Sequence, residues 1–390
     1  MKIALLSHEF PPYISGGIGL NCYDLAHSLS KKGVDVTVFC GISKTPRLEK
    51  VNSLLKVYRL PLFDFSPRFL WFQIRNLKFL ANRLDEFDVI HGVSPTSSAF
   101  MTCLKEKLGK PFVTTLHEVL LSDTKVFLNS SFSEWTLRDF GLHVLEFPLF
   151  NFLINQSLSC ADHVIVCGRS AYDDLKLFCP KLNFAKISVI HNGIDLERIP
   201  EDLKNRNETD CSVIHFGRLV WTKGSSYLLK AVKILKKDYP EIKVEICGDG
   251  PFKPKIESLI RSLNLQDTVS LKGFVPNPLL IRQILSSQVA VFPTLYEVGP
   301  FIAALEAMAC EKPIVAFDMP FSREFIKDNY NGLLSDPSVE GLAERIRFLL
   351  SNKEIAGKIG QNARADIEEH YNWNTLVSSY IEVYENLLRR

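Results

Sequence analysis

The sequence predicts an α/β fold made of two doubly wound, Rossmann-like domains. Three observations predict it: short apolar runs alternate with segments of helix length, the alternation restarts near the middle of the chain, and a polar stretch separates the two series. The chain has 390 residues, of which 46% are hydrophobic and 23% charged, so it is long enough for two globular domains.

The expected strands are apolar on both faces, as in parallel sheets covered by helices on both sides. The first series is expected at 3–6, 35–40, 88–91, 112–116 and 163–167. The second series is expected at 212–216, 243–247, 268–271, 289–292 and 313–316. The polar stretch 195–210 lies between the two series. We therefore expect an N-terminal domain over 1–200, a C-terminal domain over 201–372 and a final helix over 373–390.

Charge and cysteine content exclude several classes of protein. The chain carries 46 Lys and Arg against 44 Asp and Glu, a net charge of +2, so no nucleic-acid partner is expected. Nine cysteines are scattered without a CxxC pair, which favours a reducing compartment. The sequence shows no run of 18 apolar residues and no secretory signal, so we expect a cytoplasmic protein without a membrane span.

Glycine turns at two strand ends are suited to an anion. Gly16 and Gly17 follow the first expected strand and precede a helix, whose N-terminus and backbone N–H groups attract negative charge. Gly248 lies in a similar turn after strand 243–247. Each turn also fits an ordinary strand-to-helix connection, so both interpretations remain open.

Donors of hydrogen bonds and positive charge follow two strands of the second series. Arg218 and Lys223 come after strand 212–216, where they would bind a diphosphate or, alternatively, be solvated surface charges. After strand 289–292, the N–H groups of Gly299, Phe301 and Ile302 are expected at a helix N-terminus, where they would face an anion.

Two carboxylates and a histidine complete the candidate site. Glu297 and Glu306 flank the last of these turns, and Glu306 stands in an apolar run, where a carboxylate should be paired or should bind a ligand. His117 ends strand 112–116 and is expected in the crevice, or alternatively has a structural role. The chain has no Asp-x-Asp and no zinc-like spacing, so neither a metal nor another cofactor is expected.

Taken in order, these motifs resemble those of family 4 of the retaining glycosyltransferases, which have the GT-B fold. The resemblance extends over nearly the whole chain. Its most specific segments are HNGID (191–195), FGRLVWTKG (216–224), CGDGP (247–251) and PTLYE…LEAMACEKPIVAFD (293–318). It implies two Rossmann-like domains facing across a deep cleft, with the last helix packed back on the N-terminal domain.

The resemblance also implies which residues contact a nucleotide-sugar donor. It implies phosphate contacts from Gly17, Arg218 and Lys223, a ribose contact from Glu306, sugar contacts from Glu297 and His117, and a backbone contact to the base from Val275. The family usually places its two carboxylates eight positions apart, whereas Glu297 and Glu306 are nine apart. We expect a one-residue bulge to absorb this difference.

The implied reaction is transfer of a hexosyl unit from a UDP- or GDP-sugar to a hydroxyl of a glycan or lipid-linked acceptor, with retained configuration. No covalent nucleophile is evident, so we expect same-face attack without a metal. The alternatives are a sugar-nucleotide epimerase, a phosphorylase, or a non-catalytic subunit that binds a nucleotide-sugar on the same fold.

The segment 66–84 contains no acidic residue and suggests a membrane partner. At helical spacing, Leu70, Ile74, Leu77, Ala81 and Leu84 form one apolar stripe. The opposite face is expected to expose Arg68, Arg75, Lys78 and Arg83 together with Trp71, Phe72 and Phe79. Such a face fits an anionic lipid surface and peripheral membrane attachment, or alternatively the solvated basic face of an acceptor-cleft or core helix.

Overall fold

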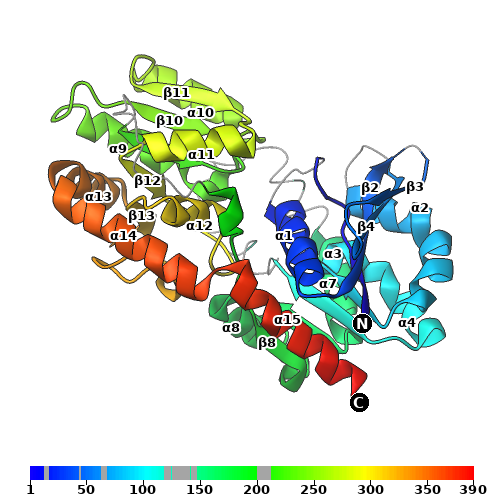
Figure 1. Cartoon of the computed structure of the whole chain (residues 1–390). Helices are drawn as coiled ribbons and strands as arrows, with labels where there is room; N and C mark the ends of the chain where they lie inside the picture. Colours follow the sequence, from blue (N-terminus) through cyan, green and yellow to red (C-terminus); the bar gives the residue numbers. More distant parts are fainter. Residues whose placement is uncertain are drawn as a thin grey trace. The chain divides into compact units, whose positions relative to one another are not determined.

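Two sheets covered by helices form the molecule, as the sequence predicts (Figure 1). The computed structural model describes residues 1–12, 17–43, 45–62, 68–117, 124, 141, 147–199 and 212–390. Contacts divide these residues into two compact units. The first contains the described parts of Met1–Thr124 and Leu142–Asn192 together with Trp373–Arg390, and the second is formed mainly by Gly193–Asn372.

The first unit is built on an eight-stranded sheet in the order β3-β4-β2-β1-β5-β6-β7-β8, in which β3 pairs antiparallel with β4 and the other pairs are parallel. Its strands are β1 (Lys2–Leu6), β2 (Asp35–Ser43), β3 (Arg47–Lys50), β4 (Leu55–Pro61), β5 (Val89–Gly92), β6 (Phe112–Leu116), β7 (His163–Val166) and β8 (Ile187–Val189). Its helices include α1 (Gly17–Lys31), α2 (Arg68–Arg83), α3 (Pro95–Ser98), α4 (Thr102–Leu108), α7 (Phe147–Cys160), α8 (Arg169–Phe178) and α15 (Trp373–Leu388).

The second unit is built on a parallel six-stranded sheet in the order β11-β10-β9-β12-β13-β14. Its strands are β9 (Val213–Phe216), β10 (Val244–Cys247), β11 (Val269–Gly273), β12 (Val289–Phe292), β13 (Ile314–Phe317) and β14 (Leu333–Ser335). Its helices are α9 (Ser225–Leu235), α10 (Lys253–Ser262), α11 (Asn277–Ser286), α12 (Ile302–Ala309), α13 (Val339–Ser351) and α14 (Lys353–His370).

All ten predicted strands are present, with ends that differ by at most three residues from those observed. The sequence did not predict β3, β4, β8 and β14. β3 is short, charged and almost wholly exposed, and β8 and β14 have three residues each. In β4, Lys56 and Arg59 interrupt the apolar residues, so none of the four shows a long apolar run. The chain passes between the units at Asn192–Gly193, whereas the predicted boundary was residue 200.

The last helix contributes large side chains to the core of the first unit. Trp373, Tyr380 and Tyr384 of α15 are buried beside α1 and the first sheet. His91 of β5 lies between α15 and β6, with Nδ1 2.6 Å from the Tyr384 hydroxyl and Nε2 2.8 Å from the Thr115 hydroxyl. Burial lowers the pKa of His91 to about 3, so this imidazole is neutral near pH 7.

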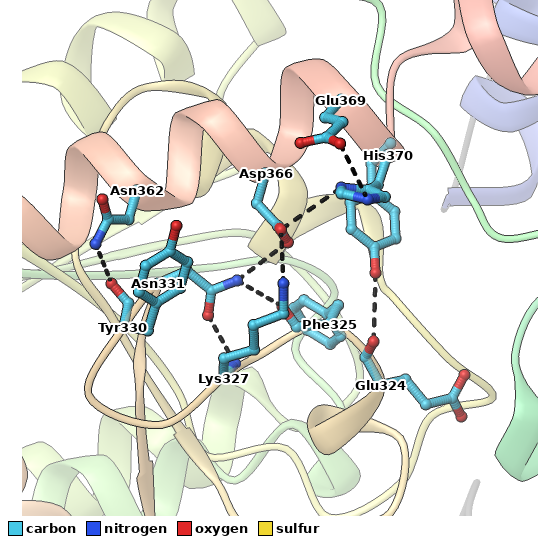
Figure 2. A network of polar contacts seen from close by, with 10 residues as sticks. Glu324, Phe325, Lys327, Tyr330, Asn331, Asn362, Asp366, Glu369 and His370 are labelled. Atoms are coloured by element: carbon cyan, nitrogen blue, oxygen red, sulfur yellow. Dashed lines mark hydrogen bonds and ion pairs between the residues drawn. The ribbon is translucent and has the colours of Figure 1, made fainter.

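A polar network joins the segment between β13 and β14 to α14 (Figure 2). The Asp366 carboxylate accepts hydrogen bonds from Lys327 Nζ and Asn331 Nδ2, each at 3.1 Å. Asn331 is fully buried and also donates to the Phe325 carbonyl at 2.9 Å. His370 Nδ1 lies 3.6 Å from Asp366 Oδ1. These contacts fix the chain that follows β13, because every member has a partner within the same unit.

The apolar stripe predicted over 66–84 is not the buried face of α2: Leu84 at its end is buried, but Leu70, Leu77 and Ala81 are only partly buried. The buried residues are Phe69, Phe72, Gln73, Asn76 and Leu80, whereas Ile74 of the predicted buried stripe is 50% exposed. The reason is that two amides are satisfied inside the protein. Gln73 Nε2 donates to the Thr96 carbonyl, and Asn76 Nδ2 donates to the Pro61 carbonyl at 2.8 Å. Burying these amides turns Phe72 inward and Ile74 outward.

The cations of α2 remain at the surface. Arg68, Arg75, Lys78 and Arg83 are exposed, and Trp71 is half-buried beside them. Among the described residues, no helix combines the length and the apolar character that crossing a bilayer requires.

Replacing Tyr384 with Phe tests the attachment of α15. The substitution leaves one buried nitrogen of His91 without its partner, so we expect the free energy of unfolding to fall by about 1–3 kcal/mol. Urea denaturation measures this change. The control is Tyr330→Phe, at a tyrosine that is 49% exposed, which should alter stability far less. Equal effects of the two substitutions would contradict the role of the buried contact.

Candidate functional site

The order of the second sheet reverses between two neighbouring strands, β9 and β12. From β9 the chain continues to β10 and β11 on one side, and then returns to β12, β13 and β14 on the other. Ligands of open parallel sheets bind outside the carboxyl ends of the strands at such a reversal. The two loops at this point are 217–224 after β9 and 293–301 after β12, and they carry most of the predicted donor-binding residues of this unit.

Backbone hydrogen bonds hold the strand-end loops close together. The N–H of Gly217 donates to the Cys247 carbonyl at 3.0 Å, and the N–H of Gly248 donates to the Gly273 carbonyl at 2.7 Å. Gly248 has a φ of +153°, and a Cβ at this position would lie 1.9 Å from the Gly217 carbonyl oxygen. The loop after β10 therefore requires glycine here, because a side chain would separate it from the loop after β9.

A neutral histidine fixes β9 against β12 beneath these loops. His215 is buried, with Nδ1 2.8 Å from the Val291 carbonyl and Nε2 3.0 Å from the Ser225 hydroxyl. Burial lowers the pKa of His215 to about 4. The neutral ring therefore donates from Nδ1 to Val291 and accepts from Ser225 at the start of α9.

Lys223 and Glu297 form an ion pair that joins the two loops. The Lys223 ammonium donates to Glu297 Oε1 and lies 5.5 Å from the centre of the Phe301 ring. Both charged side chains are 22% exposed, so the pair is reachable from solvent. The N–H of Leu295 donates to the Thr222 carbonyl at 2.7 Å, which fixes the backbones on either side. Glu297 therefore contacts Lys223, although Glu297 and Glu306 are nine positions apart and not eight as in the family pattern.

The N-terminus of α12 lies in the same loop. Gly299 has a positive φ of 152°, which glycine adopts readily. Phe301 is the N-cap of α12, which begins at Ile302. Within the part of the chain that the structure describes, no side chain caps this end. The partial positive charge of this helix N-terminus therefore lies beside the loop that carries Lys223, whose ammonium is 5.5 Å from the centre of the Phe301 ring. Arg218 is exposed at the end of β9.

Glu306 is a buried carboxylate on α12. Its side chain is 4% exposed, and Oε1 accepts a hydrogen bond of 2.8 Å from Asn277 Nδ2 at the start of α11. Burial raises the pKa of Glu306 to about 7, while the charge of Arg198 and the hydrogen bond from Asn277 act in the opposite direction. Val275, two residues before Asn277, is half-buried in the turn after β11.

The first unit carries the remaining candidate residues. Gly17 is the first residue of α1, which follows β1, and Gly16 lies outside the described residues. His117 follows β6, and its Nδ1 lies 3.3 Å from Cys167 Sγ. Burial lowers the pKa of His117 to about 4, an effect that a hydrogen bond with the Val93 backbone partly opposes. The imidazole is therefore neutral near pH 7.

Sequence reasoning missed Asn277 and His215. Asn277 stands before a proline in a turn, and His215 stands inside an apolar strand, so neither position has a pattern that indicates its partner. Only the fold brings Asn277 to Glu306 and His215 to Ser225. Across the described ranges, no group of three His, Cys, Asp or Glu side chains is arranged as a metal site requires.

Two family descriptions match the chain. Residues 15–198 match the family model described as Glycosyltransferase Family 4, and residues 199–366 match the one described as Glycosyl transferases group 1. An uncharacterized glycosyltransferase of Methanocaldococcus jannaschii is 28% identical over 406 residues, which cover 99% of this chain and 98% of the relative. A glycogen synthase of Mycobacterium tuberculosis is 24% identical over 98% of this chain and 94% of its own.

Solved structures share the fold over the full length. Sucrose-phosphate synthase from Thermosynechococcus elongatus has a TM-score of 0.83 at 21% identity, covering 100% of this chain and 99% of its own. An Anabaena protein solved in complex with UDP-glucose has a TM-score of 0.72 at 18% identity, covering 99% of this chain and 100% of its own.

The raised pKa of Glu306 predicts a pH dependence of stability. Between the ordinary pKa of a glutamate and about 7, the folded protein keeps a proton that the unfolded chain has lost, so the free energy of unfolding falls as pH rises. The loss contributed by Glu306 between pH 4.5 and 8 should be on the order of 3 kcal/mol. Glu306→Gln should remove it, so that the variant gains stability relative to the wild type as pH rises. Urea midpoints across this range measure the difference, and parallel profiles would refute the prediction.

Proposed function

Because this chain belongs to family 4 of the glycosyltransferases and has their GT-B fold, we propose that it transfers a hexosyl unit from a UDP- or GDP-sugar to a hydroxyl of a glycan or lipid-linked acceptor. The observation that carries the proposal is the Lys223–Glu297 ion pair beside the N-terminus of α12, at the point where the strand order reverses. A cation and a helix N-terminus at one place fit the diphosphate of such a donor.

We assign a role in donor binding to each candidate residue of the second unit. Arg218 and Lys223 bind the diphosphate and stabilise the negative charge that develops on it as the sugar leaves. Glu297 holds the Lys223 ammonium and lies beside the donor sugar. Glu306 receives the ribose, and the backbone at Val275 contacts the base. Fixed protein charges take the place that a metal ion has in other transferases, so we propose a metal-independent reaction.

We propose that the anomeric configuration is retained. The bond between the anomeric carbon and the diphosphate oxygen breaks, and the acceptor oxygen forms its bond to that carbon on the same face. The acceptor proton passes to the departing diphosphate oxygen, which gains the electron pair of the broken bond. His117 is neutral near pH 7, so it is suited to a hydrogen bond with a sugar hydroxyl rather than to carrying charge.

Ligands of proteins with the same fold support a nucleoside diphosphate donor. The Anabaena protein was solved with UDP-glucose, and the catalytic domain of starch synthase IV from Arabidopsis thaliana, with a TM-score of 0.74, was solved with ADP and acarbose. Because these ligands differ in base and sugar, a binding measurement is needed to identify the base and the sugar of this donor. Thermal-shift screening with UDP-, GDP- and ADP-sugars does this, because a ligand of the folded state raises its melting temperature.

Removing either cation should abolish most turnover. Arg218→Ala and Lys223→Ala each delete one charge that stabilises the leaving diphosphate, so kcat/KM should fall by about 100-fold or more. The assay follows release of the nucleoside diphosphate from the donor that the thermal-shift screen identifies. The control is Lys233→Ala, at an exposed lysine on α9, which should retain activity. Nearly intact kcat/KM in Arg218→Ala would refute its assignment.

A lipid-linked acceptor is the acceptor class that we propose on the basis of α2. Its exposed face carries Arg75 and Lys78 with the 50% exposed Ile74 and the half-buried Trp71, and the helix contains no acidic residue. Cations beside apolar side chains suit the surface of a membrane with anionic lipid. Phe72 is fully buried and takes no part.

Charge reversal on α2 tests this attachment. Flotation with liposomes that contain anionic lipid should recover the wild type, and Arg75→Glu with Lys78→Glu should lose most of the bound fraction. The control reverses two other exposed lysines, Lys233 of α9 and Lys237 in the turn that follows it, both to Glu, which changes the net charge equally. If both double variants float alike, α2 is not the contact.

A further inference from the structure

A hydrogen bond between two helices of the second unit points to a further residue of the donor site. We propose that Asn277 is a positioning residue for the donor ribose: its amide holds one oxygen of the Glu306 carboxylate and leaves the other oxygen to receive the ribose hydroxyls. The proposal rests on the function proposed above, in which Glu306 binds the ribose. It adds to that function a second residue, which acts through Glu306.

Asn277 is placed to orient the Glu306 carboxylate. Asn277 is the first residue of α11 and is half-buried, whereas Glu306 is 4% exposed in the middle of α12. The bond of 2.8 Å joins Nδ2 of Asn277 to Oε1 of Glu306. A carboxylate has room for about four hydrogen bonds, so one amide leaves capacity for hydroxyl donors. Fixing Oε1 also restricts rotation of the carboxylate and defines the direction of Oε2.

Asn277 also acts on the charge of Glu306. Two groups act on the carboxylate: the amide of Asn277 and the guanidinium of Arg198, which lies in the 3₁₀ turn Leu196–Arg198 before β9. Both favour the ionised form, whereas burial opposes it and raises the pKa of Glu306 to about 7. A ribose hydroxyl donates to the ionised carboxylate more strongly than to the neutral acid. Binding of the nucleotide near pH 7 should therefore release a proton from Glu306 to the buffer.

Removing the Asn277 amide should make nucleotide binding depend more strongly on pH. In Asn277→Ala the ionised carboxylate loses a hydrogen bond, so the pKa of Glu306 rises further and more of the free protein is protonated at pH 7. We expect nucleoside diphosphate binding to weaken about tenfold at pH 7 and to recover in part at pH 9. The number of protons released on binding should increase at pH 8, because the free carboxyl group still holds its proton there.

Isothermal titration calorimetry measures both the affinity and the proton release. UDP, GDP and ADP are titrated at pH 7, 8 and 9, each in two buffers of different ionisation enthalpy. Asn362→Ala is the matched control, because its amide also bonds a carbonyl of the same unit, that of Tyr330 at 2.9 Å, but at an exposed position. Asn277→Asp is a second variant, in which a carboxylate replaces the donor, and its affinity at pH 7 should fall further than that of Asn277→Ala.

The outcomes separate the two proposals. If the wild type binds none of the three nucleotides, the proposed function fails, and the role of Asn277 fails with it. If the wild type binds and Asn277→Ala keeps its affinity and proton release, the positioning role alone is overturned. A loss of affinity that is equal at all three pH values, with unchanged proton release, also overturns it, because that result indicates only a displaced helix.

Discussion

Hydrogen bonds between backbones hold together the loops at the carboxyl edge of the second sheet. Beyond the last residue pair of two parallel strands the sheet no longer constrains the chain, so loops must be fixed by other contacts. Here Gly217 bonds Cys247, Gly248 bonds Gly273, and Leu295 bonds Thr222. Because these bonds use main-chain atoms, they leave the nearby side chains available for a ligand. The requirement for glycine at Gly248 follows from the same closeness.

Burial of ionisable groups follows one pattern in both units. His91, His117 and His215 lie at or near the ends of β5, β6 and β9, and burial keeps each of them neutral near pH 7. A neutral imidazole both donates and accepts, so it can join two elements without bringing a charge into the interior. Glu306 is also buried, and its interior charge is offset by Arg198 and Asn277. At the strand-end loops of the second unit, by contrast, Arg218 is exposed and Lys223 and Glu297 are paired with each other.

The parts of the fold that the sequence predicted are those with a strong apolar pattern. Ten strands, the α/β class and the position of the last helix in the chain could be predicted, because buried parallel strands are apolar on both faces. β3 and the buried face of α2 could not, since charged edge residues and satisfied amides such as Gln73 and Asn76 do not follow the simple rule of apolar inside and polar outside.

The candidate site was predictable to a similar degree. The positions of Arg218, Lys223 and Glu297 after strand ends follow from the sequence, but their pairing does not, because the loop before α12 is one residue longer than the family pattern. The structure shows that Glu297 contacts Lys223 despite that difference. The contact of Asn277 with Glu306 joins residues from two helices and leaves no trace in either local sequence.

The first unit is not continuous in the chain, and this affects how the protein is made. Trp373, Tyr380 and Tyr384 belong to its core, yet they are translated after the whole of the second unit. During synthesis, the first sheet emerges from the ribosome early and lacks these three side chains until the end. The second unit, by contrast, has all its strands available before α15 appears. The half of the protein that is synthesised first is therefore the half that completes its folding last.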